Sequence, residues 1–116
     1  MTLSIHSPYE LIAALPHLLG FTPEESIVFI PLGPDLPLAR IDLPTTAAAR
    51  DEVWNTIHAA FSRYAHSGAS VAIVCMSDDL EAAELVGHHF AVRLSSIGIR
   101  CPAETVGGRH SLVRPR

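Results

Sequence analysis

Two short apolar runs constrain the fold of this chain more than any other part of its sequence. Residues Ile27–Ile30 and Val71–Met76 show no alternation between apolar and polar positions, and β-branched side chains are common in both. Runs of this kind are typical of strands that are covered on both faces. The sequence therefore predicts a sheet with these two strands in its interior and with helices on either side.

The first helix is predicted by its capping residues. Ser7-Pro8-Tyr9-Glu10 places a capping serine, a proline and an acid at the spacing of a helix start, so the helix should begin at Pro8. Gly20 should end it. Because Pro16 lacks the donor for one helical hydrogen bond, we expect a kink or a break near Leu15.

Two longer helices are predicted farther along the chain, each with an apolar stripe at helical spacing. One is capped by Thr45 or Thr46 and ended by Gly68. The other is capped by Asp78 and ended by Gly98. Both are long enough to cross the length of a sheet, so we expect them to connect strands.

Two further strands complete the predicted sheet. Leu38–Leu43 alternates, with Arg40 and Asp42 on one face, and is expected to be an edge strand. Ile99–Val106 is expected to hold the last strand, at an edge or with a bulge, because Pro102 cannot donate a hydrogen bond. The expected fold is α/β, a three-layer α-β-α sandwich around a mixed four-stranded sheet. We expect strand order 2-1-3-4, with strand 2 antiparallel to the other three.

Charge is sparse and unevenly distributed. Charged residues make up 17% of the chain, the formal net charge is −4, and all 8 basic residues are arginines. Residues 1–106 hold 5 arginines and all 12 acids, giving −7, whereas residues 107–116 hold 3 arginines and no acid, giving +3. An acidic body without lysine argues against a nucleic-acid partner. We expect a single α/β domain over residues 1–106 and a basic tail over residues 107–116, either a solvated terminus or the start of a longer segment.

Membrane and export signals are not evident. No apolar run approaches the roughly 20 residues that a membrane-spanning helix needs, and Met1–His6 has neither the basic nor the apolar region of a signal peptide. We expect a cytoplasmic protein with no membrane partner. Sparse charge together with 48% hydrophobic residues instead favours self-association or packing against another protein segment.

One segment resembles a known family. Residues 7–28 read SPYELIAALPHLLGFTPEESIV, which is similar to the opening of the actinobacterial domain of unknown function family 4192: a capped helix, a Pro-x-Leu-Leu-Gly-Phe-x-Pro-x-x-Ser stretch and an apolar strand. Gly108-Arg109 resembles a later Gly-Arg segment of that family, with His110 in place of an aromatic residue. The resemblance implies an α/β fold and a cytoplasmic protein of actinobacterial origin, without an assigned reaction. It also implies that the chain is either the amino-terminal part of a longer protein or a short member.

Histidines and cysteines form no metal-binding or nucleophile pattern. The adjacent His88 and His89 point roughly 100° apart on a helix, so they cannot grip one ion, and no His-x-x-x-His or Cys-x-x-Cys spacing occurs. Cys75 ends a buried strand, and the acids Asp78 and Asp79 that follow it oppose a thiolate. Neither a phosphate-binding loop nor a dinucleotide fingerprint is present. We expect no metal and no cofactor, and a buried structural role for Cys75.

One polar constellation is predicted at an edge of the sheet. If strands 1, 3 and 4 run parallel, their carboxyl ends meet at one edge, where ligands of such folds gather. That edge would hold Gly33, Pro34, Asp35, Ser77, Asp78, Asp79, Gly108, Arg109 and His110. Of these, Asp78, Asp79, Arg109 and His110 are the ligand-binding candidates. In the alternative interpretation the two acids serve the start of a helix and Arg109 neutralises them.

Two functions remain open on this basis. The first is a non-catalytic binding or interaction module, which is favoured because each candidate residue also has an adequate structural role. The second is a small hydrolase-like enzyme that uses Asp78, Asp79, Arg109 and His110.

Overall fold

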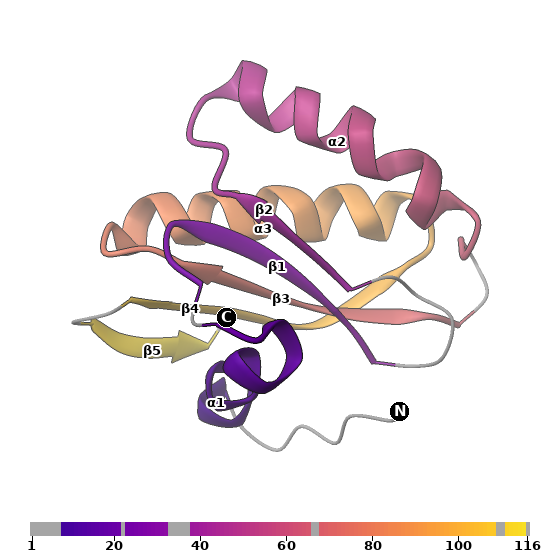
Figure 1. Ribbon diagram of the computed structural model, residues 1–116. Coiled ribbons are helices and arrows are strands. Elements are labelled where there is room, and N and C mark those ends of the chain that lie inside the picture. The colour runs from indigo at the N-terminus through magenta and orange to yellow at the C-terminus, as the bar shows by residue number, and fades with distance from the viewer. Residues whose placement is uncertain (1–7, 22, 33–37, 66–67, 109–110, 116) are drawn as a thin grey trace.

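A mixed sheet lies between helices in the computed structural model, which describes residues 8–21, 23–32, 38–65, 68–108 and 111–115. The strands follow the order β2-β1-β3-β4-β5 (Figure 1). They are β1 (Ser26–Pro31), β2 (Ala39–Asp42), β3 (Ser70–Met76), β4 (Arg100–Gly108) and β5 (Ser111–Pro115). The helices are α1 (Pro8–Leu19), α2 (Ala47–Ser62) and α3 (Leu80–Ser96). The four predicted strands are thus present in the predicted order, and β5 adds a fifth.

Helices α2 and α3 cover one face of the sheet and α1 covers the other, which confirms the three predicted layers (Figure 1). Alternate residues of β1 enter the two cores, because side chains of a strand point to opposite faces. Ile27 and Phe29 pack with α2 and α3, whereas Val28 and Ile30 pack with α1. All four are at most 1% exposed. The prediction of an interior strand covered on both faces is therefore confirmed for β1.

Phe29 sets the spacing of the two helices above the sheet. Its ring centroid lies 5.7 Å from that of Phe61 in α2 and 5.7 Å from that of Phe90 in α3. All three rings are completely buried. One large side chain of β1 therefore contacts both helices, and α2 and α3 lie side by side over the sheet.

The direction of β1 differs from the prediction. β1 pairs antiparallel with both β2 and β3, while β3 pairs parallel with β4. The predicted arrangement, in which strand 2 alone is reversed and strands 1, 3 and 4 are parallel, is wrong. Because α2 follows β2 closely and carries the chain once along the sheet, β3 begins at the end where β2 began and runs in the same direction. The hairpin with β2 leaves β1 antiparallel between two parallel neighbours.

Helix α1 runs without a break from Pro8 to Leu19, with Pro16 inside it. The predicted start at Pro8 is confirmed, and of the predicted kink or break near Leu15 the break does not occur. Leu15 is 1% exposed and anchors the helix in the core beneath the sheet, whereas Pro16 lies on the exposed side. A ring on the outer side of a helix bends it without ending it. Gly20, with φ 83°, follows the last turn and donates its N–H to the Pro16 carbonyl at 2.8 Å.

The boundaries of the two longer helices are also corrected in part. Thr46 is the cap of α2, and its hydroxyl accepts a hydrogen bond from the backbone N–H of Ala49 at 3.0 Å. Helix α2 ends at Ser62 rather than at Gly68, and Gly68 lies in the turn that follows. The cap of α3 is Asp79 rather than the predicted Asp78.

Strand β4 lies inside the sheet, because β5 pairs antiparallel with its outer side. Between the pairs of Ser70 with Arg100 and of Ala72 with Ala103, the register of β3 and β4 shifts by one residue. This irregularity surrounds Pro102, so of the two predicted alternatives, an edge or a bulge, the structure supports the bulge. Residues 111–115, which the sequence assigned to a basic tail, form β5.

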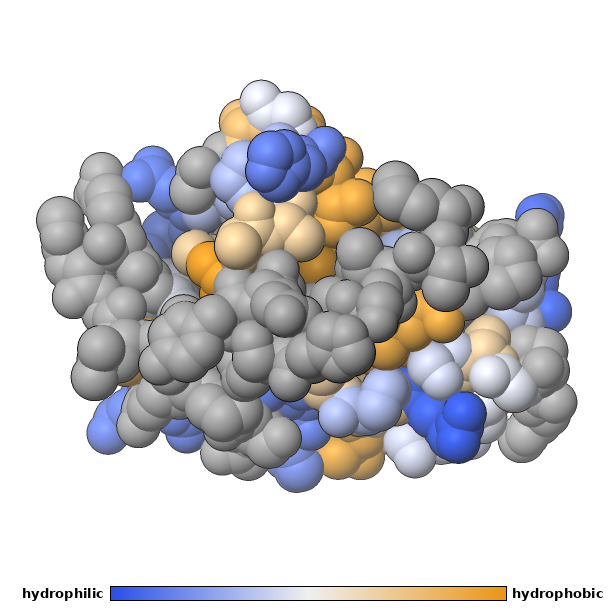
Figure 2. All heavy atoms as spheres, turned by 90° about the horizontal axis from the view of Figure 1, so that it is seen from below, coloured by the Kyte–Doolittle hydropathy of each residue, from blue (hydrophilic) through white to orange (hydrophobic). Residues whose placement is uncertain are grey.

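The face covered by α1 shows orange hydrophobic and blue hydrophilic side chains next to one another among its described residues (Figure 2). Phe21, just after α1, is 50% exposed. Across the ranges that the structure describes, no helix combines the length and apolarity that crossing a membrane requires.

Candidate functional site

The carboxyl end of β3 meets the amino end of β1, because these strands are antiparallel. Ser77 follows β3 and is 3% exposed. Its hydroxyl donates to Glu25 Oε1 at 2.8 Å, and Glu25 Oε2 accepts the N–H of Asp78 at 3.2 Å. Glu25 holds this position with a φ of 44°, in the left-handed region that side chains other than glycine rarely adopt. The Glu25 carboxylate therefore ties the start of β1 to the turn after β3.

Ser77 and Asp79 make further hydrogen bonds at this turn. The Ser77 hydroxyl accepts the N–H of Asp79 at 3.0 Å, and the Ser77 N–H donates to the Gly107 carbonyl at 2.8 Å. The Asp79 carboxylate caps α3 by accepting the N–H of Ala82 at 3.1 Å. Each of these groups has a partner within the fold, which is the pattern of a structural turn.

The structure brings together only part of the predicted constellation. Asp78 and Asp79 lie side by side at this turn, both exposed. Arg109 and His110 lie outside the described residues, as do Gly33, Pro34 and Asp35. The last residue of β1, Pro31, pairs with Val71 at the start of β3, so the carboxyl end of β1 lies at the opposite end of this strand pair from Asp78. Glu25, before β1, lies at this edge, whereas the predicted strand direction placed the start of β1 at the other end.

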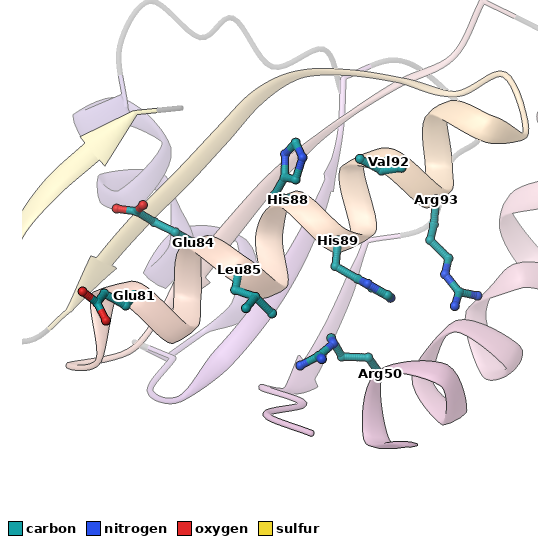
Figure 3. A pocket seen from close by; sticks show the side chains of 8 residues that line it. All are labelled: Arg50, Glu81, Glu84, Leu85, His88, His89, Val92 and Arg93. Carbon is teal, nitrogen blue, oxygen red and sulfur yellow. The ribbon is translucent and has the colours of Figure 1, made fainter. Parts of the chain in front are cut away.

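A pocket of about 690 Å³ lies along α3, from its first turn at Glu81 to Arg93, beside the first turn of α2 (Figure 3). It is lined by Arg50, Glu81, Glu84, Leu85, His88, His89, Val92 and Arg93. Leu85 and Val92 are 55% and 54% exposed, which is high for apolar side chains of this size. They lie seven residues apart on α3 and so share one side of the helix. The pocket thus has an apolar strip along α3 with charged side chains at its ends.

Two buried nitrogen atoms in this pocket lack hydrogen-bond partners in the described part of the chain. They are Arg50 Nε, from α2, and His89 Nε2, from α3. His89 extends from α3 toward α2, the helix that carries Arg50 (Figure 3). Burial lowers the pKa of His89, the positive charges of Arg93 and Arg50 lower it further, and Asp51 acts in the opposite direction. His89 is therefore a neutral ring held in a positive electrostatic potential.

Arg93 forms a fixed wall of the pocket. Its Nη2 lies 2.7 Å from Asp51 Oδ1, and its guanidinium carbon lies 5.6 Å from the ring centroid of Trp54. Both partners belong to α2, so this contact holds the two helices together beside the pocket. Arg50 lines the same pocket, but its buried Nε has no hydrogen-bond partner in the described residues.

His88 points away from His89, toward β4, as expected for adjacent residues on a helix (Figure 3). Its Nδ1 lies 3.7 Å from Glu104 Oε1. A second groove on that side includes Cys101, whose pKa is raised to about 12 by burial and then by Glu104. Cys75 is also raised to a pKa of about 12 by burial and by Glu104. Both thiols are therefore protonated at neutral pH, which leaves them poor nucleophiles.

Among the described residues, no group of three or more histidine, cysteine, aspartate or glutamate side chains is arranged to hold a metal ion.

The pocket between α2 and α3 was not predicted from the sequence. Arg50 and His89 are on different helices, and neither belongs to a local motif. The available signal was the pair of apolar residues Leu85 and Val92 next to the two histidines, outside the buried stripe of α3.

Comparisons with known proteins supply a family. No curated protein and no solved structure matches the chain. The model of one family, described as Domain of unknown function (DUF4192), matches residues 8–104. That range runs from the start of α1 into β4 and includes both the turn after β3 and every residue of the pocket. The chain therefore belongs to the DUF4192 family.

Proposed function

We propose that this domain is a non-catalytic binding module whose site is the pocket between α2 and α3. The ligand presents a carboxylate or phosphate group to Arg50 and His89 and lays an apolar portion along Leu85 and Val92. The observation that carries this proposal is the pair of buried nitrogens, Arg50 Nε and His89 Nε2, without partners in the described chain.

The energetic argument rests on how rarely buried polar atoms stay unpaired. More than roughly 90% of buried polar groups in folded proteins have a hydrogen-bond partner. Each one left unpaired costs about 1–3 kcal/mol. An anionic group bound in the pocket accepts from Arg50 Nε, and from His89 Nε2 when that nitrogen carries the ring proton, and charge-assisted bonds of this kind are about twice as strong as neutral ones. A bound anion therefore removes two unfavourable terms together.

Charge also limits the kind of ligand. Glu81 and Glu84 lie toward the start of α3, at the opposite end of the pocket from Arg93 (Figure 3). Carboxylates there repel a second anionic group, so a polyanion such as a nucleic acid is disfavoured. A small molecule or a peptide end with one anionic group and one apolar group fits better.

The two cysteines are both free thiols, which suits a reducing compartment, and we propose the cytoplasm as the location.

The turn at Ser77 supports a non-catalytic role. A nucleophilic serine needs a hydroxyl that is free to attack and a base that accepts its proton. Ser77 is 3% exposed, and its hydroxyl donates a hydrogen bond to Glu25 and accepts one from the N–H of Asp79. Asp79 is occupied by the cap of α3. The Ser77 hydroxyl and the Asp79 carboxylate are thus engaged in structural hydrogen bonds.

The test is a titration of isotope-labelled protein with phenyl phosphate, with 4-phenylbutyrate and with inorganic phosphate. The measured quantity is the shift of the NMR amide resonances of α3. We expect the two aryl anions to shift the amides around Leu85 to Arg93 and to bind more tightly than inorganic phosphate. Arg50→Gln should weaken binding by about tenfold or more, because it removes one charge-assisted hydrogen bond.

Arg63→Gln is the matched control, since it removes the same charge at the far end of α2, away from the pocket. It should leave the affinity for phenyl phosphate unchanged. Equal weakening by the two variants would mean that the anion is attracted only by net charge, and would contradict the proposed site.

A further inference from the structure

The outer edge of β2 presents unpaired backbone groups in a defined pattern. The N–H of Leu43 donates to the Glu25 carbonyl at 2.9 Å, so this pair is hydrogen-bonded across β1 and β2. In an antiparallel ladder such pairs alternate with pairs whose N–H and C=O groups point away from the neighbour. Arg40 and Asp42 stand opposite Val28 and Ser26 and belong to the second kind. Their backbone groups point outward, and in the described residues no strand pairs with that side.

The side chains of this edge divide between two faces. Arg40 and Asp42 are exposed on one face, where Arg40 Nη1 lies 2.9 Å from Asp42 Oδ1. Ala39, Ile41 and Leu43 are half-buried against the core on the face covered by α2. A groove of about 430 Å³ opens beside them, lined by Ile41, Asp42, Leu43, Pro44, Ala49, Glu52, Val53 and Thr56. The edge therefore offers hydrogen bonds, one charge of each sign and an apolar groove.

We infer that β2 is a self-association edge, at which a second copy of this chain adds its own β2 antiparallel about a two-fold axis through Ile41. In that register Arg40 stands opposite Asp42 of the second copy, and Asp42 stands opposite Arg40 of the second copy. Both pairs place outward-pointing backbone groups face to face, so each pair exchanges two hydrogen bonds. The two sheets then join into one continuous sheet across the axis.

The charges select this register over its neighbours. An axis through Arg40 would place two arginines opposite each other, and an axis through Asp42 would place two aspartates opposite each other. Like charges directly across a pair of strands are destabilising, and opposite charges are stabilising. Of these three axes, only the one through Ile41 places each charge opposite a charge of the other sign. The same axis sets Leu43 opposite Ala39 of the second copy, so the half-buried apolar residues on the α2 face form one strip.

The occupant is a second copy because the edge is complementary to itself. Arg40 and Asp42 lie one position before and one position after Ile41 and carry opposite charges. When a second strand runs antiparallel about Ile41, each charge therefore meets its opposite, which is what a two-fold interface requires. Edge strands are protected from such pairing by being very short, by charged side chains, by a proline or by a bulge. Strand β2 is short and charged, but it has no proline and no bulge within Ala39–Asp42, and its two charges are of opposite sign.

The first test exchanges the two charges. Sedimentation of the wild-type chain at increasing concentration should show a monomer–dimer equilibrium. Arg40→Asp alone and Asp42→Arg alone should each raise the dimer dissociation constant by about tenfold or more, because each puts like charges opposite each other. The double variant with Arg40→Asp and Asp42→Arg should return to within about threefold of wild type, because the pairs are restored with reversed sign.

Thermal unfolding of each variant confirms that its fold is retained. A wild-type chain that stays monomeric at the highest concentration reached would overturn the inference. Single variants that dimerise as well as wild type would overturn it equally, and so would a double variant no better than the single ones.

The second test reads the register by cross-linking. Ile41→Cys should form a disulfide-linked dimer under mild oxidation, because directly opposite residues that are not hydrogen-bonded have Cα atoms close enough for a disulfide. Ala39→Cys is the matched control. Its two copies would lie about 13 Å apart along the strands in this register, beyond the reach of a disulfide. Cross-linking at residue 39 but not at residue 41 would exclude the proposed axis.

Discussion

The turn after β3 and the pocket between α2 and α3 both gather charged side chains, but they satisfy them to different degrees. At the turn, Glu25 and Asp79 accept hydrogen bonds from within the fold. In the pocket, Arg50 Nε and His89 Nε2 are buried without a partner in the described residues. The comparison teaches that charge density alone does not identify a binding site. The informative observation is a buried polar atom that the fold itself does not pair.

The largest expected effect is at the turn. Glu25→Ala should lower the free energy of unfolding by about 2–3 kcal/mol, because it removes two hydrogen bonds and leaves the buried Ser77 hydroxyl without its acceptor. Urea denaturation measures the change. Binding of phenyl phosphate to the pocket should stay unchanged in the folded variant. A neutral effect on stability would show that the turn is not the structural element described above.

The second effect separates the two adjacent acids. Asp79→Ala should cost about 1 kcal/mol of stability, because it removes the cap of α3. Asp78→Ala should cost less than about 0.5 kcal/mol, as expected for an exposed side chain away from such features. The two variants differ by one position and have the same charge change, so each is the control of the other in urea denaturation. A larger loss from Asp78→Ala would reverse the assignment of the cap.

The third effect has the opposite sign. His89→Leu should raise the free energy of unfolding by about 0.5–1 kcal/mol, because it replaces a buried unpaired nitrogen with carbon. The same variant should lose affinity for phenyl phosphate. Stability and binding therefore change in opposite directions in the pocket, whereas at the turn stability changes alone. Loss of stability in His89→Leu would indicate that the ring has a structural partner.

The smallest effect is the pH dependence due to His89. Its pKa in the folded state lies below the ordinary value of 6.5, so the folded state binds fewer protons than the unfolded state. The contribution of His89 to stability is thus present above pH 6.5 and is lost as pH falls below it. A bound anion favours the protonated ring, so affinity for phenyl phosphate should increase over the same fall in pH. His89→Leu should remove both dependences, as followed by urea midpoints and by titration at each pH.

The sequence was sufficient for the layers and the strand order but not for the strand directions. Apolar runs without alternation predicted the burial of β1 and β3, because such a pattern has few alternatives in a small α/β domain. The direction of β1 depends on how α2 returns the chain across the sheet, which is a property of the connection and not of the strand. That single error concealed Glu25, because it placed the start of β1 at the opposite end of the sheet from Asp78. The cap of α3 was predicted one residue early, since Asp78 and Asp79 both suit the position.

The candidate site was less predictable than the fold. Asp78 and Asp79 were located correctly after β3, but a sequence pattern does not reveal whether a carboxylate is already paired. Arg50 and His89 line the same pocket because α2 and α3 lie side by side, with Phe29 in contact with both helices. A contact between two helices through a third element has no local signature in the sequence.

The position of β1 between β2 and β3 also determines the order in which the sheet can assemble. Strand β1 can pair with β2 as soon as the hairpin has been synthesised, but its other partner, β3, begins only at Ser70, after the whole of α2. Until then β1, whose side chains from Ile27 to Ile30 are all apolar, has no strand on the side where β3 later pairs. Late pairing of this kind slows folding and exposes a strand that is prone to aggregation. Fragments that end before β3 should therefore aggregate, and the stretch from Ser70 to Met76 acts as the closing strand of the nascent chain.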